Sequence, residues 1–410
     1  MTHARTIKGG VASARGFKAA GVAAEIKYKG RNDVALVVAD SPCAAAAAFT
    51  TNKVAAAPVI FDRAALGGRG YARGIRAVVA NSGCANACTG EAGLKDAELT
   101  ALVAAGELGA KPSEILVAST GVIGRRLPME RLLAGVKKAA LSLGSTPAHG
   151  LAAAKAVMTT DTKPKEAAAV CTIGGKKVTV GGMVKGSGMI EPNMATMLGF
   201  ITTDAAISPL QLRRALVLAI GKSFNRLVVD GDESTNDSVF VLASGAAGNP
   251  EITRGGADFA VFLEALESVC VSLARQMAAD GEGATKFVTV TVKGAKSERD
   301  AERAARAVAK SPLAKTSWFG RDPNWGRVLA AAGYSGADVE DSMAEVFYDG
   351  VWAYRRGEIA DERQLAKLAA VMKKDSFEIV VNLNLGRYEA SIYTCDFSTQ
   401  YVHINADYTT

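Results

Sequence analysis

The feature that most constrains this chain is a glycine-containing loop near its midpoint that turns directly into an apolar run. Residues 185–192 hold two glycines and a proline, and residues 197–201 read Met-Leu-Gly-Phe-Ile. Glycine and proline indicate irregular backbone, while an apolar run without polar alternation predicts a strand buried on both faces. Thr196 therefore stands at the junction between a loop and a rigid strand.

A threonine at such a junction suits a chain that cleaves itself. If the hydroxyl of Thr196 attacks the carbonyl of Ala195, the peptide bond becomes an ester, and hydrolysis leaves a new chain that begins with threonine. The freed α-amino group has a reference pKa of about 7.7–8.0, so it can act as general base for the hydroxyl of the same residue. Most glycine-rich loops before strands are simple turns, so the residues alone leave both interpretations open.

Histidine-based and phosphate-binding chemistries have little support. The three histidines, His3, His149 and His403, lie in no Gly-x-Ser-x-Gly or His-Glu-x-x-His setting. The Gly-Lys-Ser run at 221–223 lacks the first glycine of a phosphate loop. Residues 230–237 resemble a calcium loop but have threonine where the sharp turn needs glycine, so we interpret them as a polar turn, with a structural ion as the less favoured alternative.

Charge and composition exclude several classes of protein. The 410 residues are 49% apolar and carry a net charge of +7, but lysine and arginine are scattered, which predicts weak steering of anionic substrates and argues against nucleic-acid binding. No apolar run is long enough to span a membrane, and the first residues lack the core of a signal peptide, so we expect a cytoplasmic protein. The six cysteines are dispersed, which predicts buried free thiols and no metal site.

Strands cluster with strands and helices with helices, which predicts a layered α/β arrangement. The pairs 171–173 with 178–180 and 377–382 with 387–394 are expected to form hairpins, and 401–404 is strand-like. The alanine-rich residues 44–48 are expected to be a connection. The remaining predicted strands are 34–39, 77–80, 114–118, 227–229, 239–242 and 286–292, and the predicted helices are 95–108, 128–140, 208–222, 258–280, 299–310 and 361–373.

Nine ordered blocks resemble one family. The central block runs from Lys185 through Thr196, and the others occupy 21–27, 49–54, 81–90, 119–124, 158–162, 230–237, 280–286 and 404–410. Together they are similar to the ornithine acetyltransferases, also called the bifunctional glutamate N-acetyltransferase family of arginine biosynthesis. The family often has asparagine at the position of Cys84, so that thiol is assigned no catalytic role.

The resemblance implies a layered α/β/β/α sandwich of the self-processing N-terminal-nucleophile type. It implies cleavage between Ala195 and Thr196, which gives an alpha fragment of residues 1–195 and a beta fragment of residues 196–410. Two copies of each fragment would form an α₂β₂ heterotetramer. The family uses no metal or bound prosthetic group.

The resemblance also implies a ping-pong reaction in which Thr196 takes the acetyl group from N-acetylornithine and passes it to glutamate. Bifunctional members also accept acetyl-CoA. Thr120 and Gly121 match the pair that stabilises the oxyanion, and the positions that match substrate-binding residues are Thr159, Lys185, Thr196, Glu282, Asn405 and Thr410. We infer further that Lys185 suits the substrate α-carboxylate and Glu282 suits the ammonium of ornithine.

Two other functions stay open at this point. An N-terminal-nucleophile aminopeptidase or amidase of similar fold would release the acyl group to water. A binding protein without catalytic activity would keep the bond between Ala195 and Thr196 intact.

Overall fold

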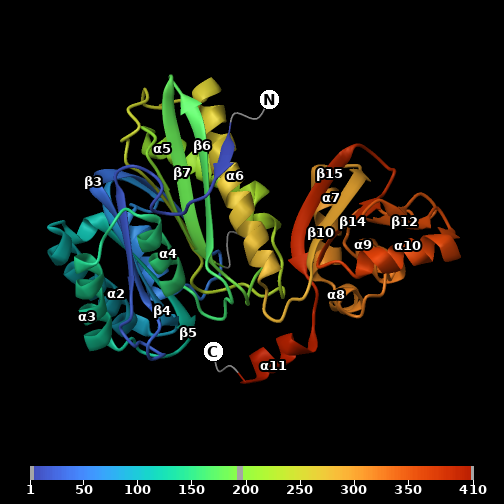
Figure 1. Cartoon of the computed structure of the whole chain (residues 1–410), viewed down its shortest axis with the longest axis horizontal. Helices are drawn as coiled ribbons and strands as arrows, with labels where there is room; N and C mark the ends of the chain where they lie inside the picture. The colour runs from blue at the N-terminus through green and yellow to red at the C-terminus, as the bar shows by residue number, and fades with distance from the viewer. Residues whose placement is uncertain (1–3, 192–196, 408–410) are drawn as a thin grey trace. The chain divides into compact units, whose positions relative to one another are not determined.

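The structure, a computed structural model, describes residues 4–191 and 197–407, and these form two compact units (Figure 1). The first unit contains the described residues up to Asn225 together with Asp232–Met277. The second contains Arg226–Gly231 and the described residues from Ala278 onward. The compact units therefore do not coincide with the predicted fragments 1–195 and 196–410.

One nine-stranded mixed sheet forms the centre of the first unit. Its order is β1-β6-β7-β8-β9-β3-β4-β5, with β2 paired to β3 beside this path. The β4–β5 and β8–β9 pairs are parallel, and the other pairs are antiparallel. The strands are β1 Arg5–Ile7, β2 Phe17–Val22, β3 Val34–Phe49, β4 Tyr71–Cys84, β5 Ile115–Val122, β6 Lys165–Ile173, β7 Lys176–Lys185, β8 Leu198–Thr203 and β9 Ser238–Ala243.

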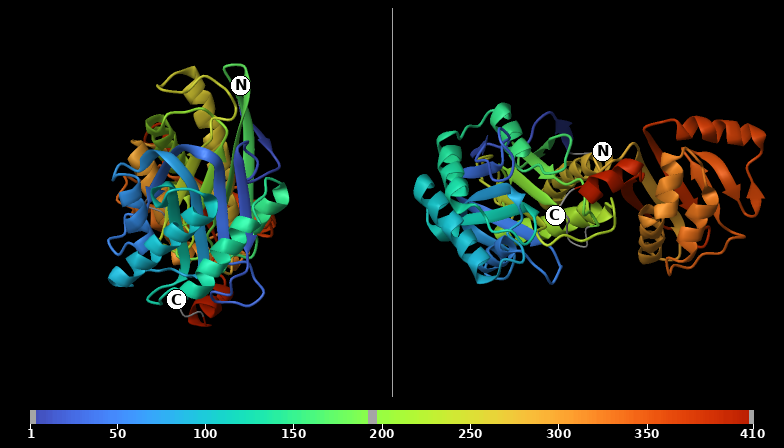
Figure 2. Two further views of the ribbon diagram at one scale, coloured as in Figure 1. Left: turned by 90° about the vertical axis from the view of Figure 1, so that its left-hand side faces the viewer. Right: turned by 90° about the horizontal axis from the view of Figure 1, so that it is seen from below.

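Alternate residues of a strand point to opposite faces of a sheet, and helices cover both faces of this one. Leu36 and Val79 belong to an apolar cluster with residues of α2 and α3, whereas Val37 and Val78 belong to a second cluster with residues of α1 and α4. Figures 1 and 2 show α2 and α3 side by side against β3 and β4. The helices are α1 Ala57–Ala65, α2 Gly90–Leu108, α3 Met129–Leu141, α4 Pro147–Ala156, α5 Pro209–Lys222 and α6 Ala257–Ala279, with short 3₁₀ turns at Pro112–Glu114 and Phe224–Arg226.

The second unit is built on a six-stranded sheet of order β13-β12-β11-β14-β10-β15. Helix α7 buries five alanine and valine side chains in the same apolar cluster as the valines of β10. The strands are β10 Phe287–Ala295, β11 Glu345–Tyr348, β12 Val351–Arg355, β13 Glu358–Ile359, β14 Ser376–Asn382 and β15 Tyr388–Cys395, and the helices are α7 Glu298–Lys310, α8 Pro312–Phe319, α9 Trp325–Gly333, α10 Glu362–Met372 and α11 Thr399–Asp407.

Several predicted elements are confirmed where local signals were strong. The apolar run after the midpoint loop is β8, which is buried along its whole length. Helix α5 starts where a serine followed by proline predicted it, and the Ser208 hydroxyl accepts the backbone N–H of Gln211 at 3.4 Å. Strands β6 and β7 form the predicted hairpin, turning at Gly174 and Gly175, which both have positive φ.

Other predictions were wrong because tertiary pairing overrides local preference. Residues 44–48 are no connection but part of β3, hydrogen-bonded on one side to β9 and on the other to β4. Strands β14 and β15 form no hairpin, because β10 lies between them. Residues 401–404 belong to helix α11, and Leu227 makes only an isolated bridge to Tyr393. Helix α4 was not predicted.

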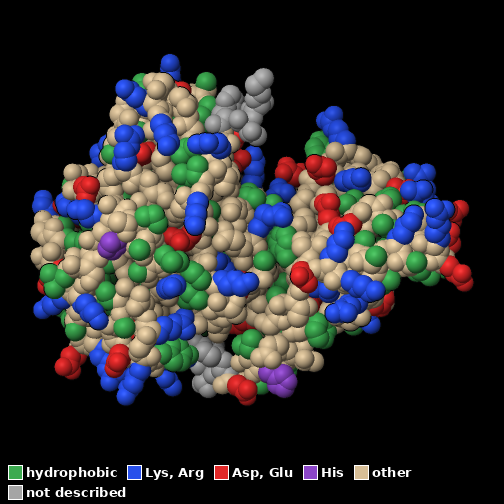
Figure 3. All heavy atoms as spheres, viewed as in Figure 1, with side chains coloured by type: hydrophobic (Ala, Val, Ile, Leu, Met, Phe, Trp, Pro, Cys, Tyr) green, Lys and Arg blue, Asp and Glu red, His purple; other side chains and the backbone are tan. Residues whose placement is uncertain are grey.

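The surface in Figure 3 carries lysine and arginine side chains dispersed over the visible face, interspersed with acidic ones. Within residues 4–191 and 197–407, no helix is long and apolar enough to cross a membrane. The same residues contain no group of three or more histidine, cysteine, aspartate or glutamate side chains placed to hold a metal ion.

Candidate active site

Thr120 and Gly121 lie at the end of β5, within the strand rather than just past its end as predicted. They pair with Ser82 and Gly83 of β4, where the register shifts. Gly121 has φ +130°, and a Cβ at this position would lie 2.4 Å from the carbonyl carbon of Gly83. Only glycine fits here, so the backbone of β5 can pass directly against β4 and end in an irregular conformation.

A buried polar network fixes the ends of these two strands. The side-chain amide of Asn236 donates to the carbonyl oxygens of Ser119 at 2.8 Å and Ala85 at 2.6 Å. The Ser119 hydroxyl donates to Asn81 Oδ1 at 2.7 Å, and Asn81 Nδ2 donates to the carbonyl of Cys84 at 2.9 Å. Buried polar groups stabilise a unique arrangement when all of them are satisfied. The backbone that carries Thr120 is therefore held rigidly.

The Thr120 side chain is buried, with an exposed fraction of 7% for the residue. Among the described residues, no hydrogen bond uses its hydroxyl group, although those of the neighbouring Ser82 and Ser119 are both engaged. A hydroxyl that is not committed to the protein can donate to a ligand. This geometry suits a hydrogen-bond donor for a developing oxyanion.

Lys185 and Thr159 meet at the end of β7, where the Lys185 ammonium donates to Thr159 Oγ1 at 3.2 Å. Strand pairing places Lys185 opposite Leu198 of β8, two residues after Thr196. A positive charge at this position can bind a substrate carboxylate.

Asp161 binds backbone and side-chain groups on both sides of the Lys185–Thr159 pair. Its carboxylate accepts the ammonium of Lys165 at 2.6 Å and the backbone N–H groups of Thr159 at 3.0 Å and Gly186 at 2.8 Å. Burial alone would raise the pKa of Asp161, but the ammonium groups of Lys165 and Lys185 outweigh this effect and hold the pKa below its ordinary value. The ionised carboxylate thus fixes both the Thr159 backbone and Gly186, the first residue after β7.

Met197 is the first described residue after Thr196, and its carbonyl accepts the N–H of Ser238 at 2.9 Å. The backbone N–H of Met197 and the hydroxyl of Ser234 both face the carboxyl group of Asp237 closely enough to lower the pKa of that group. The chain immediately after the predicted nucleophile is therefore anchored at Ser238 and lies beside Asp237.

In the second unit, Glu282 and Asn405 lie together, because Asn405 Nδ2 donates to Glu282 Oε2 at 2.8 Å. The loop that carries Glu282 packs tightly on the start of α11. A Cβ at Gly283, which has φ +68°, would lie 2.5 Å from the backbone nitrogen of Tyr401, and the Ser398 hydroxyl donates to the Gly283 carbonyl at 2.6 Å. Loop and helix therefore present the glutamate and the asparagine as one preassembled pair.

The structure thus brings together Thr159 with Lys185 and Glu282 with Asn405, and it places Thr120 and Gly121 at one strand end. Ala195, Thr196 and Thr410 lie outside the described residues. The catalytic and binding roles of all these residues stay predictions.

Comparison with known proteins identifies the chain. The model of the ArgJ family matches residues 18–410, nearly the whole length. The chain belongs to the ArgJ family. The resemblance inferred from the nine sequence blocks is thereby confirmed.

Relatives of known name agree with this family assignment. The chain is 51% identical to the arginine biosynthesis bifunctional protein ArgJ of Geobacter sulfurreducens, over 97% of this chain and 99% of that protein. It is 46% identical to the glutamate N-acetyltransferase of Methanocaldococcus jannaschii, over 99% of this chain and all of that protein. A crystal structure of ArgJ from Bacillus halodurans, 40% identical, covers 52% of this chain and all of its own chain with a TM-score of 0.50. The predicted α/β fold class of the ArgJ family is confirmed.

Sequence reasoning missed the polar residues that support the predicted ArgJ site residues. Asp161 stands in the 158–162 block, where only Thr159 was singled out. Its ion pair with Lys165 forms across an irregular segment that leads into β6, so no helical spacing indicated it. Asn236 and Asp237 end the polar block that was interpreted as a turn. Their contacts with Ser119 and Met197 join segments far apart in sequence, so no local pattern could predict them.

Proposed function

We propose that this ArgJ protein cleaves itself before Thr196 and then transfers the acetyl group of N-acetylornithine to glutamate. The observation that carries the proposal is that one sheet holds three parts of the predicted site. These are the strand end with Thr120 and Gly121, the Lys185–Thr159 pair, and β8, which starts two residues after Thr196. Family membership over nearly the whole chain supports this transferase over the amidase alternative.

The cleavage step follows from ordinary acyl chemistry. The Thr196 hydroxyl oxygen attacks the Ala195 carbonyl carbon, the C–N bond breaks, and the amide becomes an ester. Water then hydrolyses the ester, which leaves a carboxylate on Ala195 and a free amine on Thr196. The amine is the proton acceptor that the transfer reaction needs.

In the transfer step, Thr196 Oγ attacks the acetyl carbon of N-acetylornithine while its proton passes to the α-amino group of the same residue. Thr120 and Gly121 donate to the tetrahedral oxygen. The bond from the acetyl carbon to the ornithine nitrogen breaks, the nitrogen takes the proton, and ornithine leaves. The amino group of glutamate then attacks acetyl-Thr196 by the same route and regenerates the free hydroxyl.

Charge complementarity assigns the substrate contacts. By charge, Lys185 suits the α-carboxylate of ornithine and Glu282 suits its side-chain ammonium. Thr159 contacts Lys185 within the first unit, and Asn405 contacts Glu282 within the second. Thr410 is included as a substrate-binding residue on the family resemblance alone. The proposal includes an α₂β₂ assembly and a cytoplasmic location, and it requires no metal or prosthetic group. Whether acetyl-CoA serves as a second acetyl donor is decided by assaying glutamate acetylation with each donor separately.

Replacing Thr196 tests the proposed function. Thr196→Ala should leave one intact chain on a denaturing gel and no production of N-acetylglutamate from N-acetylornithine and glutamate. The unchanged protein should give two bands, the second starting Thr196-Met197-Leu198 by N-terminal sequencing. A cleaved or active Thr196→Ala protein would contradict the assignment of Thr196 as the nucleophile. If the unchanged protein releases acetate in place of N-acetylglutamate, the amidase alternative is favoured.

A further inference from the structure

The segment of residues 234–237 connects two parts of the site that are remote in sequence. Both of its ends are tied to Thr50, the residue after β3. The Thr50 hydroxyl donates to the carbonyl of Ser234 at 2.8 Å, and the Thr50 N–H donates to the carbonyl of Asp237 at 2.9 Å. Between these ties, the side chains of Asn236 and Asp237 are both buried.

Asn236 holds the strand that carries the oxyanion donors. Its amide donates to the Ser119 carbonyl, and that carbonyl shares one planar peptide unit with the N–H of Thr120. The same amide donates to the Ala85 carbonyl, just past the end of β4. One side chain thus sets the orientation of the peptide before Thr120 and its distance from β4.

Asp237 holds the strand that follows the nucleophile. The backbone N–H of Met197 faces its carboxyl group and lowers its pKa, and this N–H belongs to the peptide unit that joins Thr196 to Met197. The next residue, Ser238, donates its N–H to the Met197 carbonyl at 2.9 Å. Adjacent side chains of one segment therefore contact the residue before Thr120 and the residue after Thr196.

We propose that residues 234–237 are a positioning clamp that fixes Met197, the residue after the proposed nucleophile, relative to the oxyanion donors at Thr120 and Gly121. Asn236 and Asp237 act as positioning residues through the backbone and touch no substrate. The inference rests on the proposed function, because it assumes that Thr196 is the nucleophile. A misplacement of about 1 Å at a reacting centre costs on the order of 10²-fold in rate, so such a clamp would show in turnover.

The state of Asp237 sets which substitutions the clamp tolerates. Burial raises the pKa of Asp237 well above its ordinary value, and the hydrogen bonds from Ser234 and Met197 oppose this only in part. A raised pKa favours the uncharged carboxyl group, whose shape and acceptor oxygen asparagine reproduces and alanine does not.

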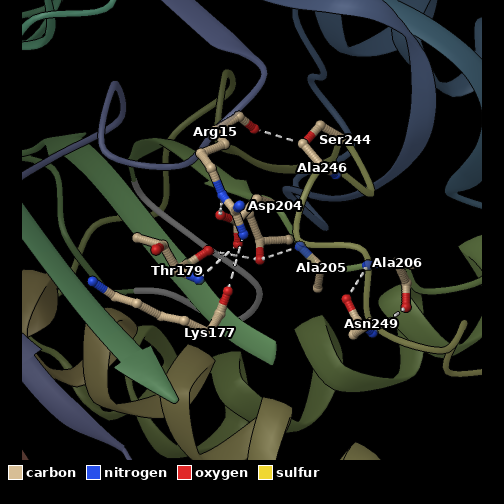
Figure 4. A network of polar contacts seen from close by, with 10 residues as sticks. Arg15, Lys177, Thr179, Asp204, Ala205, Ala206, Ser244, Ala246 and Asn249 are labelled. Carbon is tan, nitrogen blue, oxygen red and sulfur yellow. Dashed lines mark hydrogen bonds and ion pairs between the residues drawn. The ribbon is translucent and has the colours of Figure 1, made fainter. Parts of the chain in front are cut away.

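The first experiment compares two buried asparagines of the same unit. Asn249 resembles Asn236 in burial, and its Nδ2 donates to the carbonyls of Ala206 at 3.1 Å and Pro250 at 2.8 Å, neither of which is a predicted site residue. Figure 4 shows Asn249 beside Ala206. Asn236→Asp should lower kcat for acetyl transfer on the order of 10²-fold, with KM little changed and self-cleavage slowed. Asn249→Asp should lower the melting temperature comparably and leave kcat and self-cleavage unchanged.

The second experiment keeps the inference testable if Asn236→Asp does not fold. Asp237→Asn should retain cleavage and transfer, whereas Asp237→Ala should slow both. Any one of three results would overturn the clamp. The first is an unchanged kcat in folded Asn236→Asp, and the second is an equal loss of kcat in Asn249→Asp. The third is equal rates in Asp237→Asn and Asp237→Ala. If Thr196→Ala is inactive and uncleaved while one of these results appears, the clamp fails and the proposed function stands.

Discussion

At the scale of single residues, the candidate site depends on backbone placement more than on reactive side chains. Gly121 lets β5 approach β4, and Asn81 and Asn236 hold the surrounding carbonyls. Thr120 is left as a buried hydroxyl on a rigid strand end. An oxyanion donor of this kind stabilises the transition state and contributes little to the binding of the substrate in its ground state.

Replacing Thr120 should therefore affect turnover far more than binding. Loss of one oxyanion donor typically costs on the order of 10² to 10³ in kcat, so Thr120→Ala should lose turnover in this range with KM for N-acetylornithine almost unchanged. Steady-state kinetics on the cleaved protein measure both constants. Thr100→Ala is the matched control, because this buried hydroxyl donates to the Asp96 carbonyl within α2. A Thr120→Ala effect confined to KM would contradict the oxyanion role.

At the scale of elements, the sequence predicted the helices and strands that depend on neighbouring residues. It missed those that depend on pairing with distant strands. Helix α5 has its own serine cap, and β8 is a continuous apolar run, so both were predicted almost to the residue. Residues 44–48 are a strand only because β9 and β4 hydrogen-bond to them. Alanine has weak preference for strands, and a sequence window contains no sign of these partners.

The same limit applies to the candidate site. The motif blocks located Thr159, Lys185, Glu282 and Asn405, but they did not predict which of these side chains contact one another. Residues 401–404 looked like a strand because they include valine and isoleucine, whereas the structure starts α11 after Ser398, whose hydroxyl accepts the Gln400 N–H at 3.1 Å. Asn405 consequently lies one helical turn from Tyr401, where its amide reaches Glu282.

Helix α11 should serve substrate binding and leave cleavage untouched. Asn405→Ala removes the hydrogen bond that orients Glu282, so KM for N-acetylornithine should rise while the rate of self-cleavage stays the same. Gel analysis of freshly made protein and steady-state kinetics on the same variant measure the two effects. Gln400→Ala, an exposed change on the same helix, is the control. Equal KM values for both variants would remove Asn405 from the site.

At the scale of the whole molecule, the predicted cleavage point falls inside the sheet of the first unit. Strand β7 belongs to residues 1–195 and β8 to residues 196–410, and they pair from Val180 with Thr203 to Lys185 with Leu198. Met183 of one predicted fragment and Phe200 of the other are buried in one apolar cluster. Cutting the loop between paired strands removes a connection and none of these contacts.

The two fragments should therefore stay associated after cleavage. A purification tag attached before Met1 should retain residues 196–410 on the column through washes in native buffer, since separation would expose the buried faces of β7 and β8 to water. Washing in a denaturant should release the beta fragment alone, and mass spectrometry of each eluate identifies it. Thr196→Ala provides the control, because its intact chain should stay bound under both conditions. Loss of the beta fragment in native buffer would show that the β7–β8 pairing does not hold the cleaved protein together.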